Sequence, residues 1–162
     1  MKNFEELQAN IIDWAKEREL DTKGTVQGQK MKTIEELAEL LIGISKDNKE
    51  VIKDSIGDVA VTLIIGNMLG DKLDIVKIYE KISGFFAFKD KGEVISILVN
   101  KMQDICFGGY SKSHLLSILT TLKSVAKFYD LEFLDCLESA YNEIANRKGK
   151  MIDGTFVKEQ DL

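Results

Sequence analysis

The chain has 162 residues, 44% of them hydrophobic, and this length and composition predict a single domain with a sizeable core. The formal net charge of −5 argues against a broad electrostatic interaction with nucleic acid. The first twenty residues lack the apolar core of a signal peptide, and the longest apolar run, Val59 to Ile65, is too short to span a membrane. We therefore expect a cytoplasmic protein without a membrane partner.

Hydrophobic periodicity predicts an all-α fold, a helical bundle of antiparallel helices, and the complete lack of proline favours long helices. Gly24 and Gly28 mark residues 21–30 as a loop. Residues 151–157 contain an Asp-Gly turn between two short β-prone runs, which predicts a C-terminal β-hairpin. The expected helices cover residues 3–19, 32–46, 49–69, 72–84, 92–107, 112–129 and 131–147.

Two acidic clusters lie on the second and third expected helices. Glu35 and Glu36 are four and three residues before Glu39, and such spacings place side chains on one helix face. Asp54 and Asp58 are again four apart, on a helix that follows a short connection and should pack antiparallel. Converging carboxylates repel one another unless a cation lies between them. Hard oxygen ligands suit Mg²⁺, with Mn²⁺ as the alternative, so the clusters predict a metal site.

The same acids also have an ordinary structural interpretation. Runs of charge usually form solvated helix faces. Thr33 has the character of a helix N-cap, and Glu36 three residues later would then complete a capping box. Both interpretations remain open at the level of the sequence.

A weaker pattern repeats at an offset of about sixty residues. Residues 34–41 can be aligned with residues 95–102, and residues 79–82 with residues 141–144, with hydrophobic positions kept and the acids lost. This predicts a degenerate duplication in which one half carries the chemistry and the other contributes packing.

The motif Glu35-Glu36-x-x-Glu39, followed by an acidic pair that ends in Gly57-Asp58, resembles the MazG-like all-α nucleoside triphosphate pyrophosphatases. Their pattern is Glu-Glu-x-x-Glu, a spacer, then Glu-x-x-Asp. Residues 140–151 and the hairpin after them are similar to the phage and firmicute subgroup, as are residues 14–18. The resemblance covers residues 3–69 and 131–160. We expect residues 1–162 to form one domain, in which residues from about 70 to 130 look like an insertion or the degenerate repeat.

This resemblance implies an enzyme that hydrolyses an NTP or dNTP between the α and β phosphates to a monophosphate and pyrophosphate. Glu36, Glu39 and Asp58 would be the Mg²⁺ ligands, and Glu35 a ligand or the catalytic group that orients the attacking water. The chain departs from the family at Ser55, where the third acid usually stands. Asp54, one residue earlier, would replace that acid, although one helical position turns a side chain by about 100°.

The candidate nucleotide-binding residues are less constrained. The resemblance assigns Arg147 and Lys148 to the triphosphate, although basic residues at a helix end also complement its dipole. Trp14 could stack on a base or pack in the core. The remaining candidates, any of which could simply be solvated, are Gln29 and Lys32 near the acidic helix and Asn142 near the C-terminal segment.

Two functions of different kinds follow from the sequence. The first is a Mg²⁺-dependent nucleotide pyrophosphohydrolase that clears unwanted nucleotides from the pool. The second is a catalytically silent helical interaction module on the same scaffold. We expect a homodimer, with the alternative that a duplicated chain buries internally the surface that shorter relatives bury by pairing.

Overall fold

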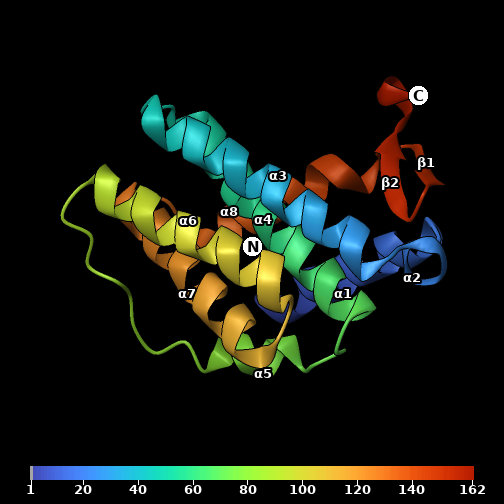
Figure 1. The fold of residues 1–162 in the computed structure, drawn as a ribbon, viewed down its shortest axis with the longest axis horizontal. Coiled ribbons are helices and arrows are strands. Elements are labelled where there is room, and N and C mark those ends of the chain that lie inside the picture. The colour runs from blue at the N-terminus through green and yellow to red at the C-terminus, as the bar shows by residue number, and fades with distance from the viewer. Residues whose placement is uncertain (1) are drawn as a thin grey trace.

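The computed structural model describes residues 2–162 and confirms the expected all-α bundle with a C-terminal hairpin (Figure 1). The described residues form eight α-helices, two strands and a closing 3-10 turn. Their bounds are α1 Phe4–Glu17, α2 Leu20–Lys23, α3 Val26–Ser45, α4 Lys49–Leu69, α5 Ile75–Glu80, α6 Lys91–Gly108, α7 Lys112–Phe128, α8 Phe133–Ala145, β1 Gly149–Ile152, β2 Thr155–Lys158 and the 3-10 turn Glu159–Asp161.

Helix α4 is the centre of the bundle, packed against α1, α3, α7 and α8. From Ser55 to Asn67 every residue of α4 is buried except Asp58. A helix that is apolar on all sides must be surrounded by other helices, which explains this central place. Helix α8 approaches closely because residue 57 is a glycine: a Cβ at Gly57 would lie 2.3 Å from the carbonyl oxygen of Cys136. No helix within residues 2–162 is long and apolar enough to cross a membrane.

The prediction of a loop over residues 21–30 is wrong, because most of α2 and the first five residues of α3 occupy it. Thr25 is the N-cap of α3, and its hydroxyl accepts the amide proton of Gly28 at 3.0 Å. Thr33 therefore lies inside the helix, where its hydroxyl bonds to the Gln29 carbonyl at 3.1 Å. The capping box predicted for Thr33 and Glu36 is thus also wrong, and Glu36 has no capping task.

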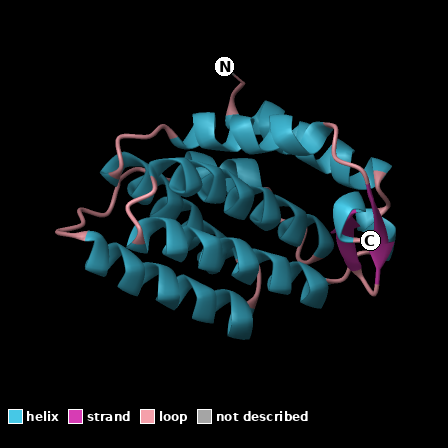
Figure 2. Ribbon diagram, turned by 90° about the horizontal axis from the view of Figure 1, so that it is seen from above, coloured by secondary structure: helices cyan, strands magenta, loops and turns pink. Residues whose placement is uncertain are grey.

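The hairpin stands at one end of the bundle (Figure 2). Its tip docks on the start of α3, where the amide of Thr25 donates to the carbonyl oxygen of Gly154 at 3.0 Å. The close approach needs a small residue on α3, since a Cβ at Gly28 would lie 2.6 Å from the Thr155 hydroxyl. This contact brings the chain from β2 onward beside a helix more than 120 residues earlier in the sequence.

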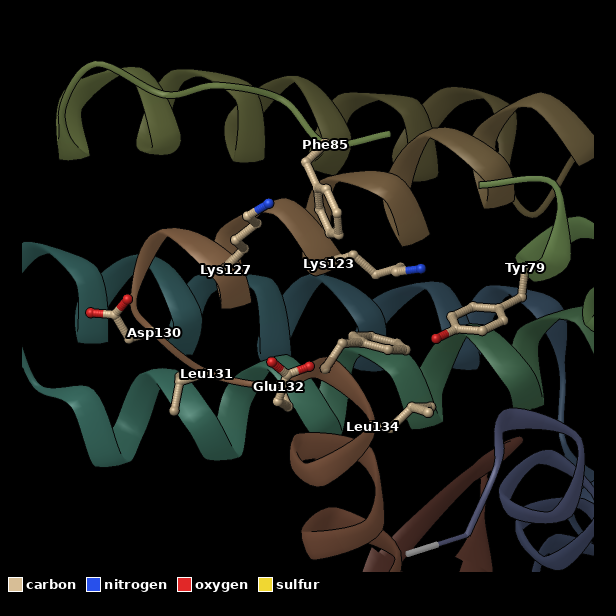
Figure 3. A pocket seen from close by; sticks show the side chains of 9 residues that line it. Tyr79, Phe85, Lys123, Lys127, Asp130, Leu131, Glu132 and Leu134 are labelled. Atoms are coloured by element: carbon tan, nitrogen blue, oxygen red, sulfur yellow. The ribbon is translucent and has the colours of Figure 1, made fainter. Parts of the chain in front are cut away.

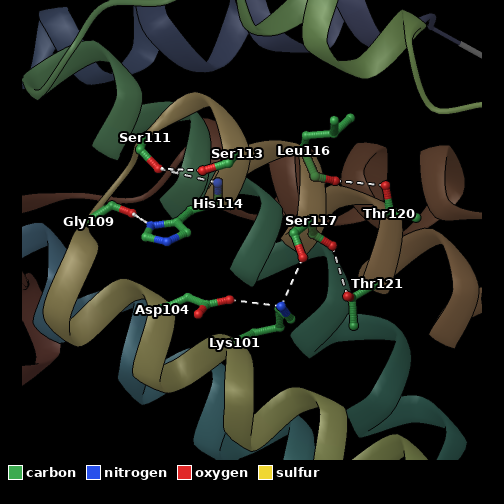
Figure 4. Close-up of polar contacts among 10 residues, drawn as sticks. All are labelled: Lys101, Asp104, Gly109, Ser111, Ser113, His114, Leu116, Ser117, Thr120 and Thr121. Atoms are coloured by element: carbon green, nitrogen blue, oxygen red, sulfur yellow. Dashed lines mark hydrogen bonds and ion pairs between the residues drawn. The ribbon is translucent and has the colours of Figure 1, made fainter.

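Helices α6 and α7 form a second helical pair, and α6 packs against α3. A polar network joins the pair (Figure 4). The ammonium of Lys101 donates to Asp104 and to the hydroxyl of Ser117, both at 2.8 Å. The Nδ1 of His114 donates to the carbonyl of Gly109 at 3.0 Å. In the expected duplication α3, α4 and α5 would correspond to α6, α7 and α8, and the order of the helices is compatible with this. The duplication stays a prediction.

Candidate functional site

A cavity of about 350 Å³ lies where α3, α4, the end of α8 and the hairpin meet. We call it the acidic cavity. Five carboxylates line it, three from α3, one from α4 and one from the C-terminal 3-10 turn: Glu35, Glu36, Glu39, Asp58 and Asp161. The helical spacing in the sequence therefore identified side chains that share one cavity. Its volume is within the usual range for a small-molecule site.

The fifth predicted acid, Asp54, is exposed and does not line the cavity. It shares a helix face with Asp58, but four residues of helix advance the chain by about 6 Å along the axis. Asp54 therefore acts on the cavity from outside, as a like charge that raises the pKa of Asp58. Ser55, where the MazG-like pattern has an acid, is 2% exposed and also lies outside the lining.

The two half-buried carboxylates of the cavity, Glu36 and Asp58, have raised pKa values. Burial, then the charges of Asp58 and Glu39, raises the pKa of Glu36 to about 7. Burial and the charge of Glu143 raise the pKa of Asp58 to about 6, while Arg147 acts in the opposite direction. The ionised forms are thus held in a partly dry environment beside other negative charges. A proton or a cation relieves this cost.

Within residues 2–162, no three carboxylate, imidazole or thiol side chains already stand in an arrangement that could hold a metal ion. The chemistry of the donor set nonetheless fits a hard divalent cation, because Glu36, Glu39 and Asp58 offer only carboxylate oxygens and the charges of Asp58 and Glu39 raise the pKa of Glu36. Ligation would require these side chains to rearrange.

Three basic side chains also line the cavity: Lys32 on α3, Arg147 just after α8, and Lys158 at the end of β2. The ammonium of Lys32 lies 2.7 Å from the carboxylate of Glu35. Arg147 is paired with Glu143, four residues earlier. Among the described residues Lys158 has no ion pair, and its charge lowers the pKa of both Glu36 and Asp58.

Arg18 holds the backbone at Arg147, one of these three basic residues. Its Nε donates to the carbonyl oxygen of Arg147 at 2.9 Å, and its guanidinium donates to the carbonyl of Trp14 at 3.2 Å. The guanidinium also stacks over the Trp14 ring at 4.7 Å. Arg18 thereby fixes the end of α8 against the end of α1, and with it the position of Arg147.

The other end of the cavity is apolar and aromatic. Trp14 is 7% exposed and meets the ring of Phe156 edge to face at 5.6 Å, so it is both a core residue and part of the cavity wall. Gln29 is 6% exposed, and its Nε2 donates to the carbonyl oxygen of Thr62 at 3.1 Å. Leu20 and the α4 residues Val61 and Ile65 complete this end.

Two predicted nucleotide-binding residues lie outside the acidic cavity. Asn142 is exposed and does not line it. Lys148 lines a neighbouring open hollow of about 520 Å³, which shares Arg147 and Lys158 with the cavity. Sequence reasoning missed Lys158 and Phe156. The hairpin that carries them was predicted, but nothing in the local pattern indicated where it docks.

Comparisons with known proteins show a limited similarity to a phage protein. The uncharacterized 18.2 kDa protein in the rep–hol intergenic region of Haemophilus phage HP1 (strain HP1c1) is 40% identical over 82 residues. The match covers 51% of this chain and 48% of the phage protein, so the chain spans about half the length of the relative it matches. No protein-family model and no solved structure matches the chain. The MazG-like resemblance thus rests on the sequence motifs.

Proposed function

We propose that the protein is a Mg²⁺-dependent nucleotide pyrophosphohydrolase, which cleaves an NTP or dNTP between the α and β phosphates. One observation carries this proposal: five carboxylates, three basic side chains and an aromatic wall line a single cavity. The carboxylates suit a divalent cation, the basic side chains suit phosphates, and the aromatic wall suits a base.

The charges of the cavity support an orientation for the nucleotide. The base would lie at the apolar end, against Trp14 and Phe156, and the phosphates would lie beside Arg147 and Lys158. The five carboxylates repel a triphosphate, so the substrate would bind only together with a cation that neutralises them. The dependence on a divalent cation follows from this repulsion.

The positions of the acids support a role for each of them. Glu36, Glu39 and Asp58 would hold Mg²⁺, or Mn²⁺ in its place, which neutralises phosphate charge and lowers the pKa of the attacking water. Glu35, held by Lys32 at 2.7 Å, would accept a hydrogen bond from that water and orient it toward the α phosphorus. This alignment of water and phosphorus is the main contribution of the protein side chains.

The basic side chains would hold the leaving pyrophosphate. Arg147 can bind phosphate oxygens in a bidentate way, and Lys158 acts as a point charge. Because Lys158 has no ion pair among the described residues, its charge is available without breaking a contact. Arg147 would have to break its ion pair with Glu143 before it could bind phosphate, and this cost would make its contribution to phosphate binding smaller.

A catalytically silent helical interaction module is the second candidate. Two observations favour it: within residues 2–162 no preassembled metal-ligating group exists, and Asp54 lies outside the cavity. Such a module would bind neither magnesium nor nucleotide at the acidic cavity.

A panel assay separates the two. The protein is incubated with each standard NTP and dNTP, with Mg²⁺ or with EDTA, and the release of pyrophosphate is measured. The enzyme proposal predicts release with Mg²⁺ only, and loss of that release in Glu39→Gln. The silent module predicts no release from any nucleotide, and a melting temperature that Mg²⁺ plus a non-hydrolysable nucleotide does not raise.

A further inference from the structure

A second cavity of about 550 Å³ shares no lining residue with the acidic cavity. Figure 3 shows side chains from α5, the connection after it, α7 and the start of α8 converging on this space. We call it the lysine cavity. Its functional side chains are Tyr79, Phe85, Lys123, Lys127, Asp130 and Glu132.

The two lysines are its main feature. Lys123 and Lys127 are four residues apart on α7, which places them on one helix face. Neither forms an ion pair among the described residues. Instead, the Nζ of Lys123 lies 4.6 Å from the ring centre of Tyr79, and the Nζ of Lys127 lies 4.3 Å from that of Phe85. Burial lowers the pKa of Lys123, so its charge is partly desolvated without a carboxylate beside it.

Phe85 forms part of the wall although it is 50% exposed. Its position is fixed, because the amide of the next residue, Phe86, donates to the hydroxyl of Ser124 on α7 at 2.9 Å. Figure 3 shows the Phe85 ring between the two lysine side chains. An exposed ring held in this way offers a flat apolar surface beside two ammonium groups.

The opposite side of the lysine cavity carries Asp130 and Glu132, which lie away from the lysines in Figure 3. Because no ion pair joins them to the lysines, their oxygens remain free to accept hydrogen bonds. The cavity therefore presents positive charge, an aromatic surface and hydrogen-bond acceptors around one space.

We propose that the lysine cavity is a second ligand site, which binds a planar aromatic anion that also carries hydrogen-bond donors. The anionic group pairs with Lys123 and Lys127, the ring lies against Phe85, and hydroxyl or amino groups donate to Asp130 and Glu132. A nucleoside monophosphate and an aromatic hydroxy acid share this chemistry. The site does not depend on the function proposed for the acidic cavity.

Binding is measured by calorimetry in EDTA, which leaves the acidic cavity without the divalent cation on which its nucleotide binding would depend. The probes are adenosine 5′-monophosphate, 4-hydroxybenzoate and adenosine, which lacks the anionic group. We expect one or both anions to bind and adenosine not to bind. Binding of the monophosphate alone would identify a nucleotide site, and binding of both would identify a general site for aromatic anions.

Two variants locate the binding. The double variant Lys123→Gln/Lys127→Gln should lose at least about tenfold in affinity, since it removes both charge-assisted contacts. The matched control Lys112→Gln, an exposed lysine on the same helix, should bind as the wild type does. The proposal is overturned if neither anion binds, if the double variant binds them unchanged, or if Arg147→Gln/Lys158→Gln abolishes the binding instead.

Discussion

Glu36 on α3 and Asp58 on α4 line the same cavity, and the charge of Asp58 adds to burial in raising the pKa of Glu36 to about 7. Such a pair gains a proton or a cation more readily than separate carboxylates do. Protons and Mg²⁺ therefore compete for the same group of oxygens, and both the stability of the metal-free protein and its metal affinity should depend on pH.

The first prediction concerns that stability. Glu36 binds its proton more tightly in the folded state, because its pKa is raised from 4.5 to about 7. Its contribution to the free energy of unfolding is therefore fully present below pH 4.5 and is lost as the pH rises through 7. In EDTA the free energy of unfolding should fall by about 2 kcal/mol between pH 5 and 8 through this group. Urea unfolding at both pH values measures it. In Glu36→Gln this part of the decrease should be absent. An equal fall in the free energy of unfolding in the variant and the wild type would show that Glu36 is not the group that titrates.

The second prediction concerns Glu39. Glu39→Gln keeps the shape of the side chain but removes a ligand charge, so metal-dependent pyrophosphate release should disappear while the fold persists. In EDTA the variant should be slightly more stable than the wild type, because the charge that Glu39 places on Glu36 is gone. Circular dichroism and urea unfolding check the fold. Normal turnover at saturating nucleotide and Mg²⁺ would remove Glu39 from the ligand set.

The third prediction compares two aspartates on α4. Asp58 lines the acidic cavity, whereas Asp54 is exposed outside it. Asp58→Asn should raise the Mg²⁺ concentration needed for half-maximal rate by more than about tenfold, and Asp54→Asn should leave it nearly unchanged. If Asp54→Asn greatly raised the Mg²⁺ concentration needed for half-maximal rate, Asp54 would be a metal ligand, which is the role that the MazG-like resemblance gives it.

The fourth prediction compares two lysines near the C-terminus. Lys158 lines the cavity and Lys148 lines the open hollow beside it. Lys158→Gln should raise the KM of every triphosphate by about tenfold, since a point charge on phosphate does not distinguish bases. Lys148→Gln should have a smaller effect that high salt removes. The reverse order, or a change in base preference, would place the triphosphate in the hollow or turn the nucleotide around.

The fifth prediction tests the packing that positions Asp58. A Cβ at Gly57 would lie 2.3 Å from the carbonyl oxygen of Cys136, so Gly57→Ala must separate α4 from α8. Its free energy of unfolding should fall by about 1–3 kcal/mol. Gly84→Ala is the control, because beyond its two chain neighbours no atom would lie within 4 Å of a Cβ at Gly84. A Gly57→Ala protein as stable as the control would contradict the close approach.

The sequence predicted features that depend on local pattern. Helix α4 has the expected bounds of 49–69, because Asn48 caps its start and Gly70 follows its end. The acidic spacing also placed four carboxylates in one cavity. The same spacing failed for Asp54, since periodicity gives the face of a helix but not the depth along it.

Other features depend on contacts between distant segments. The start of α3 was misplaced because Gly28 signals a loop in isolation, whereas in the fold it allows the hairpin tip to dock. That docking brings Lys158 and Phe156 to the cavity, and no local pattern encodes it. The homodimer and the duplication stay predictions.

The most direct test of the central claim is to follow hydrolysis in water enriched in oxygen-18, with Mg²⁺ and the best nucleotide of the panel. Attack at the α phosphorus predicts that the label enters the monophosphate and that unlabelled pyrophosphate forms in equal amount, as mass spectrometry of the products would show. Label in the pyrophosphate, a diphosphate with inorganic phosphate as products, or no hydrolysis of any nucleotide would contradict the account.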